Sequence, residues 1–232
     1  MFKTYRIPIL TIFLVLLIDQ FIKIYIKLNY PLGEVGRLGN WCIIHFTENP
    51  GMAFGMEFGG DYGKLALSIF RIIASIAGFF YIKHIVTHKE HPLFVFCVAL
   101  ILAGALGNIF DSVFYGSIFT ESDEFMVSKL VSPGNGYASF LHGHVVDMFY
   151  FPIYNGYFPE WFPIWGGEDF QFFRPIFNFA DFAISAGVAI LILFQKKLSK
   201  KPEAEVEAAV DSSSGANTEQ IIDNASQNNT QP

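Results

Sequence analysis

The sequence predicts an all-α membrane protein with four transmembrane helices, a small β-cradle outside the membrane and a further outer segment that lies on the membrane interface. Hydrophobic residues make up 52% of the 232 residues and charged residues only 16%, whereas a soluble domain carries about 25% charged residues. The apolar residues are gathered in blocks long enough to cross a bilayer. The net charge of −6 argues against a nucleic-acid partner, which requires a basic surface.

Four stretches are expected to span the membrane, because a bilayer core about 30 Å thick needs roughly 20 apolar residues of helix. They are residues 7–26, 64–85, 93–115 and 177–194. The first is expected to be a retained helix and not a cleaved signal peptide. Its apolar run is too long, it contains Asp19, and no small-residue cleavage site follows it.

Positive charges predict the orientation of these spans. They lie before the first span, between the second and third, and after the fourth: Lys3, Arg6, Lys83, Lys89, Lys196, Lys197, Lys200 and Lys201. We therefore expect both termini to be cytoplasmic and the long connections, about 27–63 and 116–176, to lie outside. Residues 1–195 are predicted to form one domain. The tail 196–232 lacks aromatic residues and is expected to be disordered.

The two outer connections differ in character. Residues 39–58 are rich in β-branched and aromatic residues around an Asn-Pro-Gly turn, which predicts a short β-hairpin or curved sheet. The second connection has a polar half, about 117–141, and then a half rich in phenylalanine, tyrosine and tryptophan. Aromatic rings favour the headgroup region, so we expect this second half to lie on the membrane interface.

Four charged residues fall in the outer halves of the predicted spans: Asp19, Arg71, Asp111 and Asp181. Charged side chains inside a bilayer are costly and mark functional sites. Independent structural ion pairs have no reason to share one layer, whereas a site that opens from the outer leaflet does. The sequence therefore predicts a polar site in this layer.

The spacing of these residues allows two interpretations. Asp19 lies four residues before Lys23, which is also typical of a structural ion pair within one helix. Two amides lie three residues before an aspartate, where each can orient the carboxylate of its own helix or form a polar helix–helix contact: Asn108 with Asp111, and Asn178 with Asp181.

Asp147 follows His142, Gly143 and His144 at the point where the polar half of the second connection gives way to the aromatic half. We interpret the two histidines as loop residues, because no strong zinc motif such as HExxH is present. The cysteines, Cys42 and Cys97, have no ligand-like spacing and are expected to be buried. We therefore expect neither a metal nor another cofactor.

Two close aspartates can hydrolyse a peptide bond without a covalent intermediate. Like charges at short range do not both ionise easily, so one carboxyl keeps a proton and the other acts as a base. A serine protease fits poorly because no G-x-S-x-G elbow occurs. The GxGD signature of other intramembrane aspartyl proteases is absent as well.

Five short motifs over residues 7–195 resemble those of the bacterial lipoprotein signal peptidases (signal peptidase II). They are Asp19-Gln20-x-x-Lys23, Asn49-Pro50-Gly51-Met52-Ala53-Phe54, Gly104-x-x-Gly107-Asn108-x-x-Asp111, Val145-Val146-Asp147-Met148-Phe149 and Phe177-Asn178-Phe179-Ala180-Asp181. Each string is weak alone. Together they stand in the order of the family, on four predicted spans with the expected topology.

The resemblance implies that Asp147 and Asp181 form the catalytic pair. Asp19, Lys23, Asn49, Gly51, Asn108, Asp111 and Asn178 match positions that support the site or line the substrate groove. The implied substrate is a diacylglyceryl prolipoprotein in the bacterial inner membrane, cleaved just before its lipidated cysteine on the periplasmic side. Membrane lipid is the other expected partner. One chain holds all the motifs, so a monomer is expected.

Two departures from the family pattern stand out. The family has arginine after the position of Asp111, whereas this chain has Ser112, and we hypothesise that Arg71 replaces it. An inserted loop, about residues 117–141, separates Asp111 from Asp147. That loop holds a further acid, Asp123, which lacks the Val-Val context and is expected to be solvated.

Two other functions remain open from the residues alone. A small transporter or channel would use the same acids to carry ions, although the sequence shows no repeat of the kind transporters have. An intramembrane protease that acts on non-lipidated substrates would use the same catalytic pair.

Overall fold

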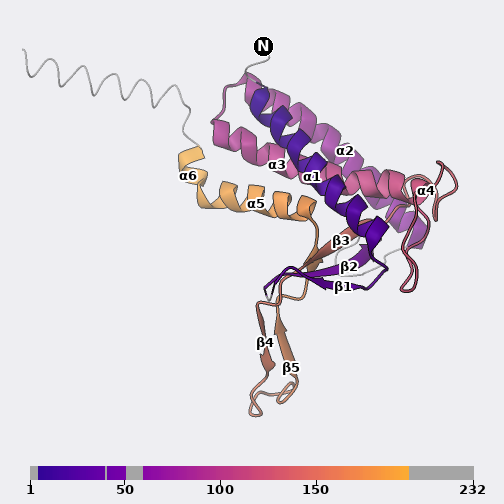
Figure 1. The fold of residues 1–232 in the computed structure, drawn as a ribbon. Coiled ribbons are helices and arrows are strands. Elements are labelled where there is room, and N and C mark those ends of the chain that lie inside the picture. Colours follow the sequence, from indigo (N-terminus) through magenta and orange to yellow (C-terminus); the bar gives the residue numbers. More distant parts are fainter. Residues whose placement is uncertain (1–4, 40, 51–59, 199–232) are drawn as a thin grey trace, which may run out of the picture.

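The computed structural model describes residues 5–39, 41–50 and 60–198. Three long helices lie side by side, α1 (Arg6–Asn29), α2 (Gly60–Thr87) and α3 (Pro92–Phe110), with strands gathered at one end of them (Figure 1). All three helices are long and apolar enough to cross a membrane. They coincide with the first three predicted spans, so those three helices are confirmed. The tail lies outside the described residues from position 199 onward.

The end of α3 changes its helical geometry. One π-helical turn, η2 (Asp111–Tyr115), follows α3 and leads into the short α4 (Gly116–Ile118). A π turn inserts an extra residue into the helix and occurs frequently at functional sites. Asp111 lies at this junction, where its side chain is fully buried.

The fourth predicted span is shorter than expected. Helix α5 (Phe179–Leu193) has 15 residues, which gives a length of about 22 Å against a bilayer core of about 30 Å. It begins later than predicted because Ile176 and Phe177 form strand β6 and Asn178 caps the helix. The short α6 (Gln195–Leu198) follows it. The described residues therefore contain three long apolar helices and one shorter apolar helix.

Helix α5 approaches α3 very closely because of two glycines. A Cβ atom added to Gly104 would lie 2.2 Å from the carbonyl oxygen of Ala180, and one added to Gly107 would lie 2.7 Å from Oδ2 of Asp19. Small residues at such an interface let the helix backbones approach each other. The glycines thus bring the start of α5 against α3 and α1.

A four-stranded antiparallel sheet lies at one end of the helices. Its order is β1 (Val35–Arg37), β2 (Ile43–Asn49), β3 (Val145–Tyr150) and β6 (Ile176–Phe177). The expected strand in the first connection is confirmed as β2, which pairs with β1 and β3. The part of the predicted hairpin that follows the Asn-Pro-Gly turn falls on residues 51–59, which lie outside the described part.

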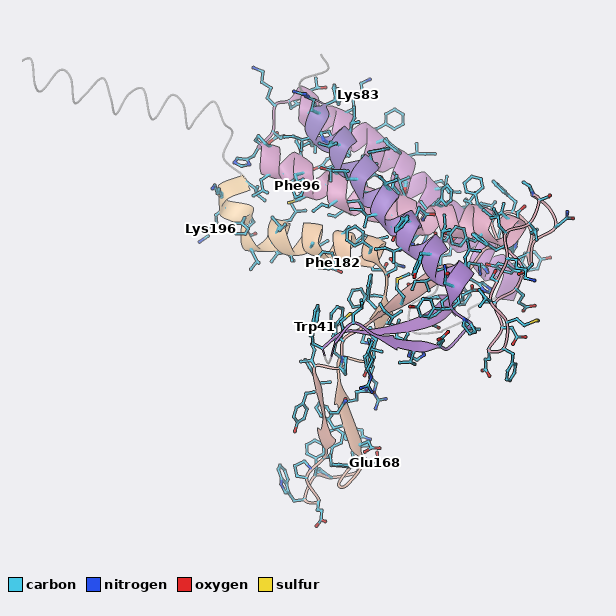
Figure 2. The ribbon with its side chains drawn as sticks, viewed as in Figure 1. Trp41, Lys83, Phe96, Glu168, Phe182 and Lys196 are labelled. Atoms are coloured by element: carbon cyan, nitrogen blue, oxygen red, sulfur yellow. The ribbon has the colours of Figure 1, made fainter. Side chains whose placement is uncertain are left out.

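The aromatic half of the second connection also contains strands. β4 (Tyr154–Tyr157) and β5 (Asp169–Phe172) pair as an antiparallel hairpin, which projects from the sheet away from the helices (Figure 1). Figure 2 places Glu168 at the far end of this hairpin and Trp41 near its base, with Lys83 and Lys196 toward the other end of the molecule. The prediction of an all-α protein with one small region of strands was therefore incomplete, because the described residues form a four-stranded sheet and a separate two-stranded hairpin.

Candidate active site

Asp147 lies on strand β3 and not in a loop as the sequence predicted. Its neighbours Val146 and Met148 are fully buried in a hydrophobic core. Successive side chains of a strand point to opposite faces, so Asp147 points to the other face of the sheet. There its side chain is nearly as buried, with 4% of its surface exposed.

Asn178 connects the two aspartates of the predicted pair. As N-cap of α5 it accepts a hydrogen bond from the backbone N–H of Asp181 (3.0 Å), while its own backbone N–H donates to Oδ2 of Asp181 (3.3 Å). This reciprocal capping box fixes the first turn of the helix. The side-chain amide of Asn178 donates to Oδ1 of Asp147 at 2.6 Å. One residue therefore bonds to both carboxylates, from the cap of α5 and not from within the helix as expected.

Asn108 on α3 orients Asp181 and not its own-helix neighbour Asp111. Its Nδ2 donates to Oδ1 of Asp181 at 2.7 Å. Its Oδ1 accepts from Lys23 (2.9 Å) and from Nδ2 of Asn178 (3.1 Å). Of the two interpretations that the spacing allowed for Asn108 and Asp111, the structure therefore shows the polar contact between helices, because both side chains have their partners on other elements.

Lys23 joins three of the predicted residues in the buried interior. Its Nζ lies 3.0 Å from Oδ2 of Asp19 and 2.8 Å from Oδ2 of Asp111, and all three side chains are fully buried. The pair Asp19–Lys23 is thus the expected ion pair within one helix, but it also extends across to α3. Through Asn108 the same ammonium group is linked to Asp181.

Backbone groups complete this network. The N–H of Ala180, in the first turn of α5, donates to Oδ1 of Asp19 at 2.9 Å. The N–H of Val146 donates to Oδ2 of Asp111 at 3.3 Å. Asp19 therefore holds the start of α5, and Asp111 holds the start of β3. In this way the two buried carboxylates support the elements that carry Asp181 and Asp147.

Sequence reasoning missed two residues of the network. Gln20 donates to Oδ1 of Asp111 (2.9 Å) and Oδ2 of Asp19 (3.1 Å), and it accepts from the hydroxyl of Tyr115 (3.0 Å). Gln20 stands inside the Asp19-Gln20-x-x-Lys23 motif, so its position was visible. The signal for Tyr115 was its place four residues after Asp111, about one helical turn.

Arg71 on α2 lies close enough for its charge to act on both Asp181 and Asp147. It does not take the place beside Asp111 that the missing family arginine would suggest, because Lys23 pairs with that acid. Ser112 donates its hydroxyl to the backbone oxygen of Asn108 at 3.1 Å. The positive charge of Arg71 is therefore directed at the predicted catalytic pair.

The environment of Asp147 favours its protonated form. Burial, together with the negative charge of Asp181, raises the pKa of Asp147 to about 7, although the hydrogen bond from Asn178 acts in the opposite direction. Desolvation and like charge both penalise an ionised carboxylate. At neutral pH a substantial fraction of the Asp147 carboxyl groups therefore carries a proton.

The remaining predicted residues lie near this site or outside the described chain. Asn49 ends β2 and pairs with Val145 at the start of β3, and Gly51 lies outside the described residues. His144 approaches Oε2 of Glu48 at 3.3 Å. Among the described residues, no group of three histidine, cysteine or acidic side chains is arranged to hold a metal ion.

An apolar groove of about 530 Å³ is lined by residues of α2, α3 and α5. Arg71 lines it together with Ser75, Gly78, Ile101 and Leu191. Tyr81, near the C-terminal end of α2, and Phe94, near the N-terminal end of α3, also line it. The groove thus runs along the membrane-spanning part and has the charge of Arg71 at one end.

The comparisons with known proteins identify the family of this chain. The model of the family described as signal peptidase (SPase) II matches residues 11–196. A protein of Porphyromonas gingivalis named lipoprotein signal peptidase is 49% identical over 183 residues, which cover 78% of this chain and 79% of that protein. One of Amoebophilus asiaticus with the same name is 36% identical over 210 residues, 89% of this chain and 83% of its own length.

A solved structure supports the fold. A bacterial membrane enzyme determined by the in meso method at 1.9 Å resolution has a TM-score of 0.51 and 24% sequence identity, covering 80% of this chain and 90% of that one. At this identity the likeness concerns the fold alone. With the family match over most of its length and a relative at 49% identity, the chain belongs to the signal peptidase II family of membrane proteases.

Proposed function

We propose that this protein is an aspartyl endopeptidase that removes the signal peptide from diacylglyceryl prolipoproteins and cleaves before the lipidated cysteine. The observation that carries the proposal is the shared partner of the buried Asp147 and the partly buried Asp181, since Asn178 bonds to both acids. Family membership supports the substrate class, because relatives at 49% and 36% identity bear the name lipoprotein signal peptidase.

The two carboxyl groups take different roles in this mechanism. Asp181 lies in the first turn of α5, where the helix dipole favours a negative charge, and it acts as the base. It takes a proton from a water molecule whose oxygen attacks the scissile carbonyl carbon. Asp147 is protonated at the start and gives its proton to the carbonyl oxygen, which forms a tetrahedral gem-diol. When the C–N bond breaks, the leaving amine takes up the proton from Asp181, and one hydroxyl of the intermediate returns a proton to Asp147 as the carbonyl re-forms.

The proposed substrate suits the apolar groove. A signal peptide is an apolar helix, and the groove between α2, α3 and α5 is lined almost entirely by apolar side chains up to Arg71. A helix in this groove would bring its end to the level of the catalytic pair. Arg71 then acts on the developing negative charge, which is how we propose that it replaces the arginine missing at Ser112.

We further propose that the site faces the periplasm across the bacterial inner membrane and that both termini are cytoplasmic. Lys83 and Lys196 lie toward the end of the molecule opposite the hairpin (Figure 2), and positive charges mark the cytoplasmic side. The short α5 is the fourth span in this arrangement. Exposed rings of the β4–β5 hairpin, among them Tyr157, Trp161 and Trp165, contact the outer membrane interface. A single chain supplies the site, so the enzyme works as a monomer.

The catalytic pair is tested by conservative variants. Asp147→Asn and Asp181→Asn keep side-chain volume and should each lower cleavage of a lipidated prolipoprotein by at least about a thousandfold, since each removes one proton-transfer group. Asp123→Asn is the matched control, because Asp123 is an exposed acid of the inserted loop. It should keep wild-type activity. Substantial cleavage by either dyad variant, at equal protein yield in the membrane, would refute the assignment.

Substrate class is tested separately with the purified wild-type protein. A diacylglyceryl prolipoprotein and its unlipidated form are compared at equal concentration, and only the lipidated form should be cut efficiently. Equal cleavage of both would favour a general intramembrane protease. Absence of cleavage together with ion flux in proteoliposomes would favour the transporter.

A further inference from the structure

A second buried ion pair lies behind the strand that carries Asp147. Lys27 stands one helical turn after Lys23 on the same buried face of α1. Its side chain is fully buried and contacts Oε1 of Glu48 on β2, whose side chain is 8% exposed. Neither residue belongs to the network around Asp19, Lys23 and Asp111, and the mechanism above does not use them.

The register of the sheet places this pair directly behind Asp147. Thr47 pairs with Asp147, and Glu48 pairs with Val146 on the neighbouring position of β3. Opposed residues in an antiparallel pair share a face and successive residues alternate. Glu48 and Val146 therefore face α1 and the hydrophobic core, while Asp147 faces Asn178 on the other side. The ion pair and the catalytic acid thus lie on opposite faces of one pair of strands.

The inserted loop completes the surroundings of the ion pair. The hydroxyl of Ser122 lies 2.6 Å from Oε1 of Glu48 and 2.8 Å from Nζ of Lys27. The rings of Phe119 and Tyr137 lie 5.4 Å and 5.1 Å from the same ammonium group, within the range of a cation–π contact. These three partners, Phe119, Ser122 and Tyr137, all belong to the inserted loop.

Two backbone hydrogen bonds tie the same loop to the ends of the neighbouring elements. The hydroxyl of Tyr137 accepts from the backbone N–H of His144 at 2.6 Å, immediately before β3 begins. The carbonyl oxygen of Asp123 accepts from the N–H of Leu32, just after α1, at 2.9 Å. The loop therefore contacts both the segment that leads into β3 and the segment that leaves α1.

A buried ion pair needs such partners. Removing two charges from water costs more than their attraction returns unless further hydrogen bonds satisfy them. Burial acts to raise the pKa of Glu48, yet its bonds to His144, Lys27 and Ser122 outweigh burial and lower that pKa to about 2. The carboxylate is thus charged at neutral pH, and its charge is held by groups from α1, the inserted loop and the start of β3.

We propose that Glu48 and Lys27, completed by Ser122 of the inserted loop, are positioning residues that fix β3 and thereby hold Asp147 at its place opposite Asp181. They act on the reaction through the strand and do not touch the substrate. This inference rests on the proposed peptidase function. It assigns the inserted loop a role in the geometry of the catalytic pair.

Ser122→Ala is the most informative variant, because Glu48→Gln leaves a buried ammonium group without its counter-charge and risks unfolding. The free energy of one hydrogen bond to a charged group corresponds to a change of roughly tenfold or more in an equilibrium or rate constant. We therefore expect Ser122→Ala to lower kcat for lipidated prolipoprotein about tenfold with KM unchanged. Ser122→Thr keeps the hydroxyl and should restore kcat to within about threefold of wild type. Ser128→Ala is the matched control, because Ser128 is also a buried serine of the same loop and, among the described residues, its hydroxyl bonds within the loop to Thr120.

The outcomes separate positioning from simple stabilisation. A loss of kcat in Ser122→Ala, with restoration by threonine and wild-type kcat in Ser128→Ala, supports the proposal. Unchanged kcat in Ser122→Ala, an equal loss in both alanine variants, or no restoration by threonine overturns it. If the wild-type protein fails to cleave the lipidated substrate, the proposed function itself is refuted, and the inference falls with it.

Discussion

Lys23→Met removes the ammonium group that lies between Asp19 and Asp111. Methionine retains the length of the side chain but none of its charge. Both carboxylates are fully buried, so neither can turn to water for compensation. In addition, Asn108 loses the donor at 2.9 Å that holds its carbonyl oxygen.

The magnitude follows from the number of partners lost. Breaking a buried ion pair by removing one partner costs about 3–5 kcal/mol. Here two carboxylates lose one shared partner, while Gln20 and the N–H groups of Ala180 and Val146 remain. We therefore expect Lys23→Met to lower the free energy of unfolding by about 4–5 kcal/mol, toward the upper end of that range.

A double-mutant cycle measures this in detergent or in lipid discs. Lys23→Met, Asp111→Asn and the double variant are compared by thermal or denaturant unfolding. The double variant contains one uncompensated carboxylate fewer than Lys23→Met, so it should recover about 1–3 kcal/mol. Lys83→Met is the matched control, because Lys83 is an exposed lysine near the end of α2. Additive single effects, or a Lys23→Met protein as stable as Lys83→Met, would refute the role of Lys23 as shared counter-charge.

Three further predictions concern the same site. The raised pKa of Asp147, about 7, lets the folded protein keep a proton that the unfolded chain releases near pH 4. The contribution of Asp147 to the unfolding free energy should therefore fall by about 1.4 kcal/mol per pH unit from pH 4 to 7, and Asp147→Asn should remove that part of the slope in unfolding curves. Gly104→Ala should cost about 1–3 kcal/mol by overpacking, since the new methyl would meet the backbone oxygen of Ala180, whereas Gly78→Ala meets only the end of a leucine side chain and should cost less in the same melting assay. Arg71→Ala should lower kcat about tenfold or more at unchanged yield, consistent with the loss of one charge aimed at the reacting groups, and Arg71→Lys should retain part of it; wild-type kcat in Arg71→Ala would exclude this role.

The helices could be predicted from the sequence because hydrophobic length is a local property. A run of about 20 apolar residues has few alternatives to a membrane helix, and α1, α2 and α3 coincide with predicted spans. The start of α5 was predicted two residues too early. Phe177, which ends strand β6, and Asn178, which caps the helix, are uncharged and therefore extend the apolar run that predicted the helix. The shared layer of Asp19, Asp111 and Asp181 was predictable for a similar reason, because depth along a helix follows from residue count.

The pairing of side chains between elements was not predictable in this way. Residues three or four apart share a helix face, but that spacing does not reveal what the face meets. For Asn108 the spacing therefore left open a bond to Asp111 or a contact with another helix, and the side chain bonds to Asp181. No role was predicted for Lys27 or Glu48, because nothing local indicated that the inserted loop would bury them together.

The inserted loop explains how the site tolerates a long separation between Asp111 and Asp147. The chain leaves near the end of α3 and returns to the same place. Backbone N–H groups of Ala138, Leu141 and Gly143 donate to carbonyl oxygens of Gly116, Val113 and Ser112.

A loop whose ends meet costs little extra entropy as it lengthens, because the closure cost grows only with the logarithm of its length. The N–H of Val146 then reaches Asp111, so β3 starts against α3 whatever the length between them. Proximity of the two acids is thus set by this return point. The loop was free to lengthen and to supply Ser122 and Tyr137 to the pair behind β3.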